Sequence, residues 1–170
     1  GGAPGGVRRG IRRGTADGVS SPSVTASAER GHVDGECPEC GAPRVDGLDC
    51  RAQRDAILGW ESNDPDLHAE HFLTVATFNV QHPAAFTDAA LAALHAGFVE
   101  YLDGRVDVAT LRRRASAAFE GARRVMRPGA ERRPTLRRWR VTVADVYHRD
   151  QPEGAVVRLR AWAASVRAEL

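Results

Sequence analysis

Residues 68–83, His-Ala-Glu-His-Phe-Leu-Thr-Val-Ala-Thr-Phe-Asn-Val-Gln-His-Pro, constrain the fold of this chain more than any other stretch. On a helix turning by about 100° per residue, apolar side chains cover one face and polar side chains form a narrow stripe. The apolar face holds Phe72, Leu73, Ala76 and Val80, and the stripe holds Glu70, Thr74, Thr77 and Gln81. A helix that is apolar over most of its circumference is largely buried. We therefore expect this stretch to be the central helix of a small helical domain.

Two histidines, His71 and His82, share a third face of this helix, beside the apolar one. They lie eleven residues apart, which separates them by roughly 16 Å along the axis of a straight helix. One metal ion therefore cannot take both from such a helix. His68 and His71 are three residues apart and can share an ion. Pro83 ends the helix and pushes the preceding residue, His82, out of helical geometry.

The other periodic segments of the chain are helical as well. Helical apolar patterns or N-cap residues mark four of them, at residues 51–62, 88–102, 108–126 and 142–146. Pro152 opens a last helix with its own apolar stripe, and no segment alternates as a strand would. We predict an all-α fold, a small bundle of about five helices that forms a single domain over residues 37–170.

Residues 1–36 are rich in Gly, Ser and Arg and carry almost no large apolar side chains. Such a segment buries too little surface to fold, so we expect a disordered tail. Its paired arginines are not followed by an apolar core, unlike those of a secretory signal. No apolar run approaches the roughly 18 to 20 residues of a membrane span. We expect no membrane partner and a cytoplasmic location.

All three cysteines of the chain lie within 14 residues, and the first two have the spacing of a zinc knuckle. In Cys37-Pro-Glu-Cys40, the turn aims both thiolates at one ion, and Gly41 permits the tight backbone. Cys50 adds a third thiolate, and a reducing compartment favours metal over disulfide. A thioredoxin-like redox pair needs a strand before the motif and a helix after it, and neither is visible.

Three thiolates require a fourth zinc ligand, and we expect His71 to supply it. His68 is an alternative, and His32 is a weaker one. The predicted metal site is thus Cys37, Cys40, Cys50 and His71, with zinc as the cofactor. On this assignment His82→Ala keeps the ion, whereas Cys40→Ser loses it.

Charge is distributed unevenly along the chain. The net charge is only +2, carried by 24 arginines and no lysine, a composition typical of GC-rich bacterial genomes. Residues 51–104 hold two arginines and eight acids, whereas residues 105–140 hold twelve arginines and three acids. The two segments can neutralise each other, or the Arg-rich 105–140 segment can bind nucleic acid, another polyanion or a protein partner.

Several motifs, taken in order, resemble a bacterial family filed as domain of unknown function 5946. They are Cys-Pro-Glu-Cys-Gly at residues 37–41, Cys50, and His-Phe-Leu-Thr-Val-Ala-Thr-Phe-Asn-Val-Gln-His-Pro at residues 71–83. His95, Val-Thr-Val-Ala-Asp-Val at residues 141–146 and Ala-Trp-Ala at residues 161–163 match later pieces of the family pattern. The resemblance covers about residues 36–170 and implies no activity.

The chain departs from that family pattern at several polar positions. Ala76 and Phe78 replace an Asp and a Tyr of the central helix, and Gly154 and Ala155 stand where the family tends to carry a histidine. A Trp-rich ending is replaced by residues 167–170. A polar site of the family can therefore be incomplete in this chain.

These observations leave three functional hypotheses, of which a zinc-stabilised helical binding or scaffold domain is the first. The second is a metal-dependent enzyme in which His71, His82 and His95 converge on one ion and leave a position open for water. His82, His95 and Gln81 would then form a second polar site. The third is polyanion binding through the Arg-rich segment.

Overall fold

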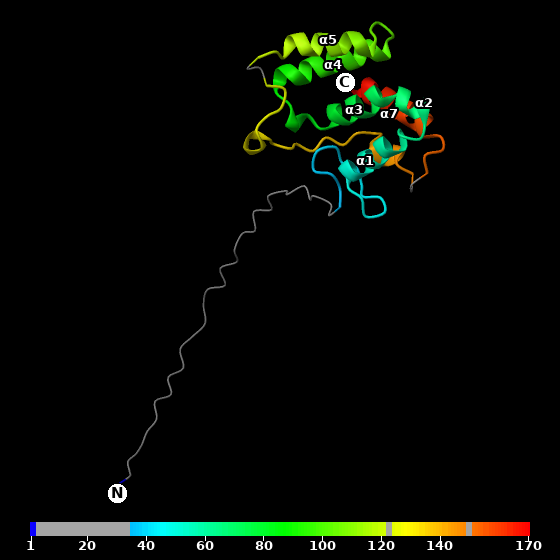
Figure 1. Cartoon of the computed structure of the whole chain (residues 1–170). Helices are drawn as coiled ribbons and strands as arrows, with labels where there is room; N and C mark the ends of the chain where they lie inside the picture. Colours follow the sequence, from blue (N-terminus) through cyan, green and yellow to red (C-terminus); the bar gives the residue numbers. More distant parts are fainter. Residues whose placement is uncertain (3–34, 122–123, 149–150) are drawn as a thin grey trace, which may run out of the picture. The chain divides into compact units, whose positions relative to one another are not determined.

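The computed structural model describes residues 1–2, 35–121, 124–148 and 151–170, and this part of the chain is helical (Figure 1). Its α-helices are α1 (Cys50–Trp60), α2 (Pro65–Ala69), α3 (His71–Gln81), α4 (Asp88–Leu102), α5 (Val108–Ala118), α6 (Val143–Val146) and α7 (Ala155–Glu169). Two short 3-10 helices are η1 (Pro83–Ala85) and η2 (Gly129–Glu131). The described residues contain isolated bridges but no strand. The all-α prediction is confirmed.

The predicted tail falls mostly outside the described residues, which omit residues 3–34. At its end, however, Gly35 and Glu36 contact the folded part. The backbone N–H of Arg44 donates to the Gly35 carbonyl over 3.2 Å, and Arg138 pairs with the Glu36 carboxylate over 2.5 Å. Gly35 and Glu36, which the predicted tail includes, therefore take part in the described fold.

Helix α3 is the centre of the core, as predicted, and packs against α1, α4 and α7. Its polar stripe is buried along with its apolar face: Thr74 and Thr77 are fully buried, and Gln81 is 1% exposed. The Gln81 amide donates to the Val141 carbonyl over 2.8 Å and accepts from the Trp162 indole over 3.1 Å. Gln81 therefore links α3 to α7 and to the segment before α6.

Replacing Gln81 with leucine is expected to destabilise the fold without affecting metal binding. The change leaves a buried indole N–H and a carbonyl unpaired, at about 1–3 kcal/mol for each such group, so thermal unfolding should occur on the order of 10 °C lower. Gln151→Leu, at an exposed position, is the matched control. Equal melting temperatures for the two variants, measured by circular dichroism, would show that the buried amide contributes nothing.

Glu70 divides the predicted central helix into α2 and α3. Its backbone angles, φ −92° and ψ 8°, lie outside the helical region. The Glu70 side chain turns toward α7 and pairs with Arg160. Glu70 is buried, with 8% of its surface exposed. An ion pair with a distant helix thus accompanies the break, and the sequence pattern of α3 alone does not contain that information.

Two other predicted helix boundaries are wrong, and a glycine accompanies each difference. The helix expected over residues 108–126 ends at Ala118, and Gly121 follows with φ +70°. The last helix begins at Ala155 rather than at Pro152, directly after Gly154 with φ +73°. Glycine adopts this left-handed conformation without steric cost, so it separates a helix from the adjoining loop.

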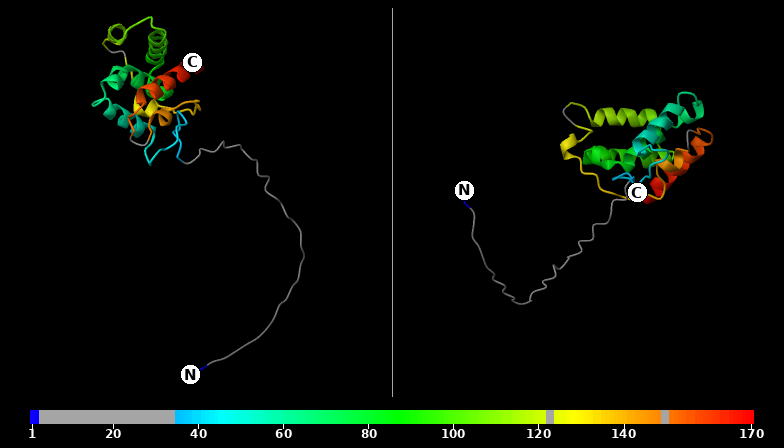
Figure 2. Two further views of the ribbon diagram at one scale, coloured as in Figure 1. Left: turned by 90° about the vertical axis from the view of Figure 1, so that its right-hand side faces the viewer. Right: turned by 90° about the horizontal axis from the view of Figure 1, so that it is seen from below.

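Helices α4 and α5 lie side by side at one edge of the folded part, away from α1 (Figures 1 and 2). Next to them, the chain around Phe86 pairs with the chain around Met126 in an antiparallel bridge. None of the described helices has both the length and the apolar character needed to cross a bilayer.

Candidate metal centre

The Cys37–Gly41 turn is closed by its own backbone and aims two cysteines in one direction. Gly41 N–H donates to the Cys37 carbonyl over 3.0 Å, and Cys37 N–H donates to the Ala42 carbonyl over 2.9 Å. Gly41 has φ +74°, which a side chain would disfavour. The backbone N–H of Cys40 points at Cys37 Sγ over 3.5 Å, an arrangement that stabilises a thiolate.

Cys50 reaches the same place because it is the first residue of α1. Asp49 caps the helix by accepting from Ala52 N–H over 2.9 Å. Gln53, one turn further, is fully buried. Its amide donates to the carbonyls of Pro43 and Leu48, both over 2.9 Å, and so fixes the cysteine loop onto α1.

His82 follows the last residue of α3 and is out of helical geometry, with φ −126° and ψ 60°. The proline at position 83 disfavours the helical conformation for it. His82 Nδ1 donates to the Phe78 carbonyl over 2.6 Å, and Nε2 faces the thiols of Cys37 and Cys50. The ring also stacks on Phe78 at 3.9 Å. A backbone carbonyl on one ring nitrogen is a common support for a metal-binding histidine.

The ligand atoms of Cys37, Cys40, Cys50 and His82 all lie within 4.8 Å of one another. His82 Nε2 is 3.6 Å from Cys37 Sγ and 3.4 Å from Cys50 Sγ. Three sulfur donors and one imidazole nitrogen match a donor set that closed tetrahedral metal sites use. A cavity of about 280 Å³ lies beside Cys37, Cys50 and His82 and gives access to the cluster.

In the metal-free chain, contacts within the cluster shift the pKa values of Cys37, Cys40 and His82. Hydrogen bonds from the Cys40 and Cys50 side chains hold the pKa of Cys37 far below its usual range. The contact with Cys37, the one with Cys50 and burial together raise the pKa of Cys40. Burial alone would lower the pKa of His82, but its contacts with Cys37, Cys50 and the Phe78 carbonyl outweigh burial and raise the pKa to about 9. Both shifts favour the charged forms of Cys37 and His82, whose Sγ and Nε2 lie 3.6 Å apart.

A side chain of the cysteine turn connects it to the end of α3. The Glu39 carboxylate accepts from the backbone N–H of Ala84 over 2.6 Å, two residues after His82. The Glu39 carbonyl accepts from Arg137 N–H over 2.9 Å. The turn that holds Cys37 and Cys40 is therefore attached to the chain just beyond His82 independently of any ion.

The structure places His71, the expected fourth ligand, with Glu61 instead of with the cysteines. His71 Nδ1 lies 2.6 Å from Glu61 Oε2, and the Thr74 hydroxyl donates to Glu61 Oε1 over 2.9 Å. The Glu61 side chain is 4% exposed and that of His71 is 46% exposed. Eleven helical residues, roughly 16 Å, separate His71 from His82. The histidine that lies with the three cysteines is therefore His82, and His71 lies outside the cluster.

The remaining histidines named by the sequence do not join the cluster. His68 is exposed and stacks beside His71 with 6.2 Å between ring centroids. His95 lies in α4, and its buried Nε2 has no hydrogen-bond partner within the described part of the chain; burial and Arg137 lower its pKa. His32 lies outside the described residues. His95 is not part of the metal-ligand group that the described residues form, and the second polar site of His82, His95 and Gln81 stays a prediction.

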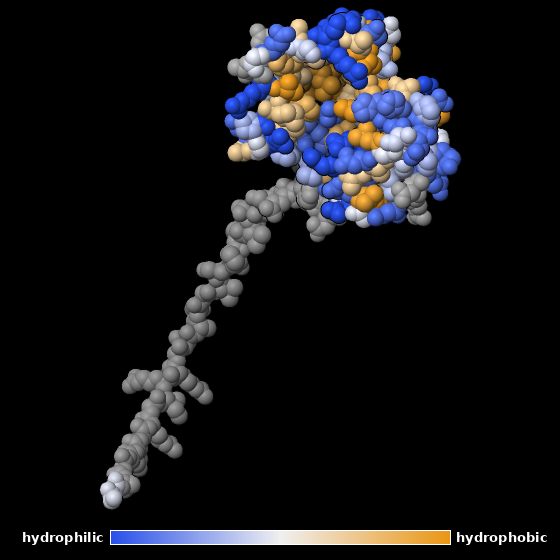
Figure 3. All heavy atoms as spheres, in the orientation of Figure 1, coloured by the Kyte–Doolittle hydropathy of each residue, from blue (hydrophilic) through white to orange (hydrophobic). Residues whose placement is uncertain are grey.

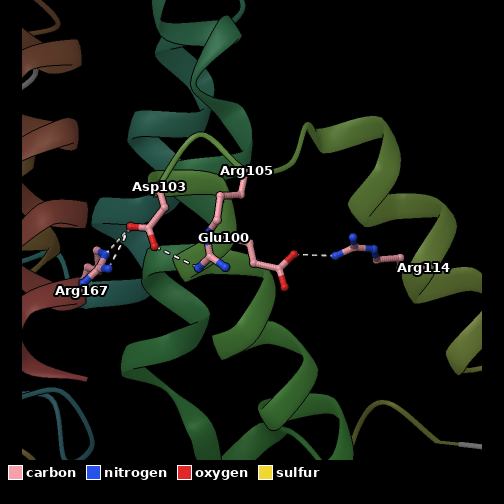
Figure 4. Close-up of polar contacts among 5 residues, drawn as sticks. All are labelled: Glu100, Asp103, Arg105, Arg114 and Arg167. Carbon is pink, nitrogen blue, oxygen red and sulfur yellow. Dashed lines mark hydrogen bonds and ion pairs between the residues drawn. The ribbon is translucent and has the colours of Figure 1, made fainter.

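Ion pairs neutralise part of the Arg-rich 105–140 segment. Arg114 of α5 pairs with Glu100 of α4 over 2.5 Å, and Arg105 pairs with Asp103 over 2.9 Å (Figure 4). Arg127 pairs with Asp88 over 2.5 Å. All three acids belong to the acidic 51–104 segment, so the opposite charges of the two segments meet in the fold. Each exposed pair contributes little stability, about 0–1 kcal/mol, and polyanion binding stays a prediction.

Comparison with known proteins identifies one family. The model of the family of unknown function DUF5946 matches residues 35–170. Neither a curated protein nor a solved structure matches the chain. The match includes all four residues of the cluster.

Proposed function

The chain belongs to the family of unknown function DUF5946, and we propose that it is a zinc-stabilised helical binding or scaffold domain. One zinc ion would be held by Cys37, Cys40, Cys50 and His82. The convergence of four soft or borderline donors from the turn, α1 and the end of α3 carries this proposal. Zinc suits such a set because it takes thiolate and imidazole in tetrahedral geometry.

A structural role has more support than a catalytic one. Four protein ligands fill the tetrahedron and leave no position for water or substrate. The alternative of an enzyme site requires His71, His82 and His95 to converge, whereas His71 bonds Glu61 and only His82 belongs to the cluster. Zinc would join the cysteine turn to the start of α1 and the end of α3, which meet at one end of this helix pair. Its binding free energy would then contribute to folding.

Removal of the metal is expected to destabilise the protein strongly. Purified chain should contain about one zinc per molecule. A strong chelator should lower the melting temperature by more than 10 °C, on the order expected when about 3 kcal/mol or more of folding free energy is lost. Adding zinc back should restore it, whereas magnesium, which prefers oxygen ligands, should not. A chain that contains no zinc and melts identically with and without chelator would refute the proposed function.

Acidification is expected to weaken zinc binding over an unusually wide range of pH. Zinc takes deprotonated thiols and neutral imidazole, so protons compete with it. Because the pKa of the metal-free His82 is raised to about 9, zinc displaces a proton from this residue at any pH below that value. The apparent affinity should therefore keep rising between pH 7 and 9, as titration with a chromogenic chelator can measure. The cysteine thiols also release protons in this range, so the same titration is made on His82→Ala. The affinity of the wild-type chain should rise more steeply with pH than that of the variant, and equal slopes would contradict the assignment of His82.

A further inference from the structure

A second cavity lies between α4 and α5, on the far side of the molecule from α1. Its volume is about 460 Å³, within the range of roughly 300–1,000 Å³ typical of small-molecule sites. Its walls are mostly apolar and include Phe72, Phe86, Leu94, Leu111, Phe119 and Val125. Figure 3 shows a hollow with hydrophobic residues in the upper part of the folded domain, where Figure 1 places these helices.

Helix α5 leaves its apolar face available to this cavity. No residue of α5 is buried, although an amphipathic helix normally buries its apolar stripe. Close contact with α4 occurs near Gly97, where an added Cβ would lie 2.9 Å from the Leu111 side chain. Beyond that contact the two helices form the sides of an open trough. The bridge between Phe86 and Met126 lies at one end.

The charges around the cavity distinguish between kinds of occupant. Four polar residues line it: Asn79, Glu100, Arg112 and Arg114. Arg114 and Glu100 neutralise each other across the two helices at 2.5 Å (Figure 4). Arg112 belongs to none of the ion pairs that the described residues form. The cavity is thus an apolar trough with one uncompensated positive charge at its wall.

We propose that the cavity between α4 and α5 binds a single-chain amphiphile with an anionic headgroup, such as a fatty acid. The alkyl chain occupies the space that Leu111 and Phe119 share with α4 and removes their apolar surface from water. The carboxylate pairs with the Arg112 guanidinium, which can donate two parallel hydrogen bonds to it. This site shares no residue with the metal cluster and does not depend on the proposed function.

Binding is tested on the full-length, metal-loaded chain with dodecanoate as the probe, measured by calorimetry and by displacement of a fluorescent fatty acid. Ala93 lines the cavity and is exposed, so Ala93→Trp should fill the space and weaken binding at least tenfold. Ala92→Trp, one residue away on the same helix and outside the cavity, should change affinity less than twofold. Circular dichroism confirms that both variants fold.

The headgroup is tested with a matched charge reversal on α5. Arg112→Glu should weaken dodecanoate binding severalfold, whereas Arg113→Glu, outside the cavity, should have little effect. Dodecanol should bind to the wild-type chain more weakly than dodecanoate does. Its affinity should be the same for the wild-type chain and for Arg112→Glu, because it carries no charge. Absence of dodecanoate binding would overturn the proposal, as would equal losses in the two tryptophan variants. Dimers that Ala93→Trp dissociates, without dodecanoate binding, would assign the cavity to a second copy of the chain.

Discussion

Cys40→Ser should lose zinc and melt at a much lower temperature than the wild-type chain. Cys40 is fully buried, and serine offers a poor zinc ligand in the same space. If about 10–16 kcal/mol of binding free energy is shared among four ligands, each contributes about 3 kcal/mol. Loss of one then weakens binding roughly 100-fold and lowers the melting temperature on the order of 10 °C. Metal analysis and calorimetry on the purified variant measure both effects.

Ala42→Ser is the matched control for this substitution. Ala42 is 1% exposed and lies in the same turn. The variant therefore buries the same serine hydroxyl as Cys40→Ser does, while it keeps all four ligands. It should retain one zinc at wild-type affinity, although the buried hydroxyl is expected to cost about 1–3 kcal/mol of stability. A Cys40→Ser protein that retains zinc at wild-type affinity would remove Cys40 from the site. Equal zinc loss in Ala42→Ser would mean that disturbance of the turn, rather than loss of a ligand, is responsible.

His82→Ala and His71→Ala should have opposite profiles. His82→Ala removes the imidazole that lies 3.4 Å from Cys50 Sγ and should weaken zinc binding roughly 100-fold. His71→Ala should keep zinc at full affinity. It should still reduce stability by about 1 kcal/mol, because Glu61, with a side chain 4% exposed, loses one of its hydrogen-bond partners.

The exposed His68 supplies the control, since His68→Ala should change neither zinc content nor melting temperature. Affinity is measured by competition with a chelator of known strength, and stability by thermal unfolding in excess zinc. Full zinc affinity in His82→Ala, together with its loss in His71→Ala, would restore the ligand set expected from the sequence alone.

Helical periodicity predicts a helix and its bounds well where the residues that start and end the helix stand in its own sequence. Residues 88–102 were bounded correctly because Thr87 caps the helix, accepting from Ala90 N–H over 3.3 Å, and Asp103-Gly104 ends it. The last turns of α3 were also clear, because Pro83 marks its end. The break at Glu70 was not visible, since it accompanies an ion pair with Arg160, ninety residues away.

The three cysteines of the cluster were identified from spacing, but its histidine was not. The helical projection places His71 and His82 on one face, and His71 was the expected ligand on the assumption that the central helix passes over the cysteine turn. Helices α1 and α3 pack against each other and have eleven residues each. Cys50 at the start of α1 meets His82 at the end of α3, and Glu61 at the end of α1 meets His71 at the start of α3. The pair is therefore antiparallel.

In an antiparallel pair of equally long helices, the start of one helix lies beside the end of the other. The sequence contains one indication of this arrangement. His82 precedes a proline, so its backbone leaves the helix and its side chain is released from the helical spacing. That signal, combined with a cysteine at the start of the other helix, could have selected His82 over His71. The choice still depends on which helices pair, and contacts distant in sequence decide this.

The most direct test of the metal assignment is X-ray absorption at the zinc edge of the purified full-length chain. The account predicts three sulfur ligands at about 2.3 Å and one nitrogen at about 2.0–2.1 Å around a single zinc. In His82→Ala the nitrogen contribution should disappear or be replaced by a water oxygen, and in His71→Ala it should persist. A first shell of nitrogen and oxygen alone, or a nitrogen contribution lost in His71→Ala and kept in His82→Ala, would contradict the Cys37, Cys40, Cys50 and His82 site.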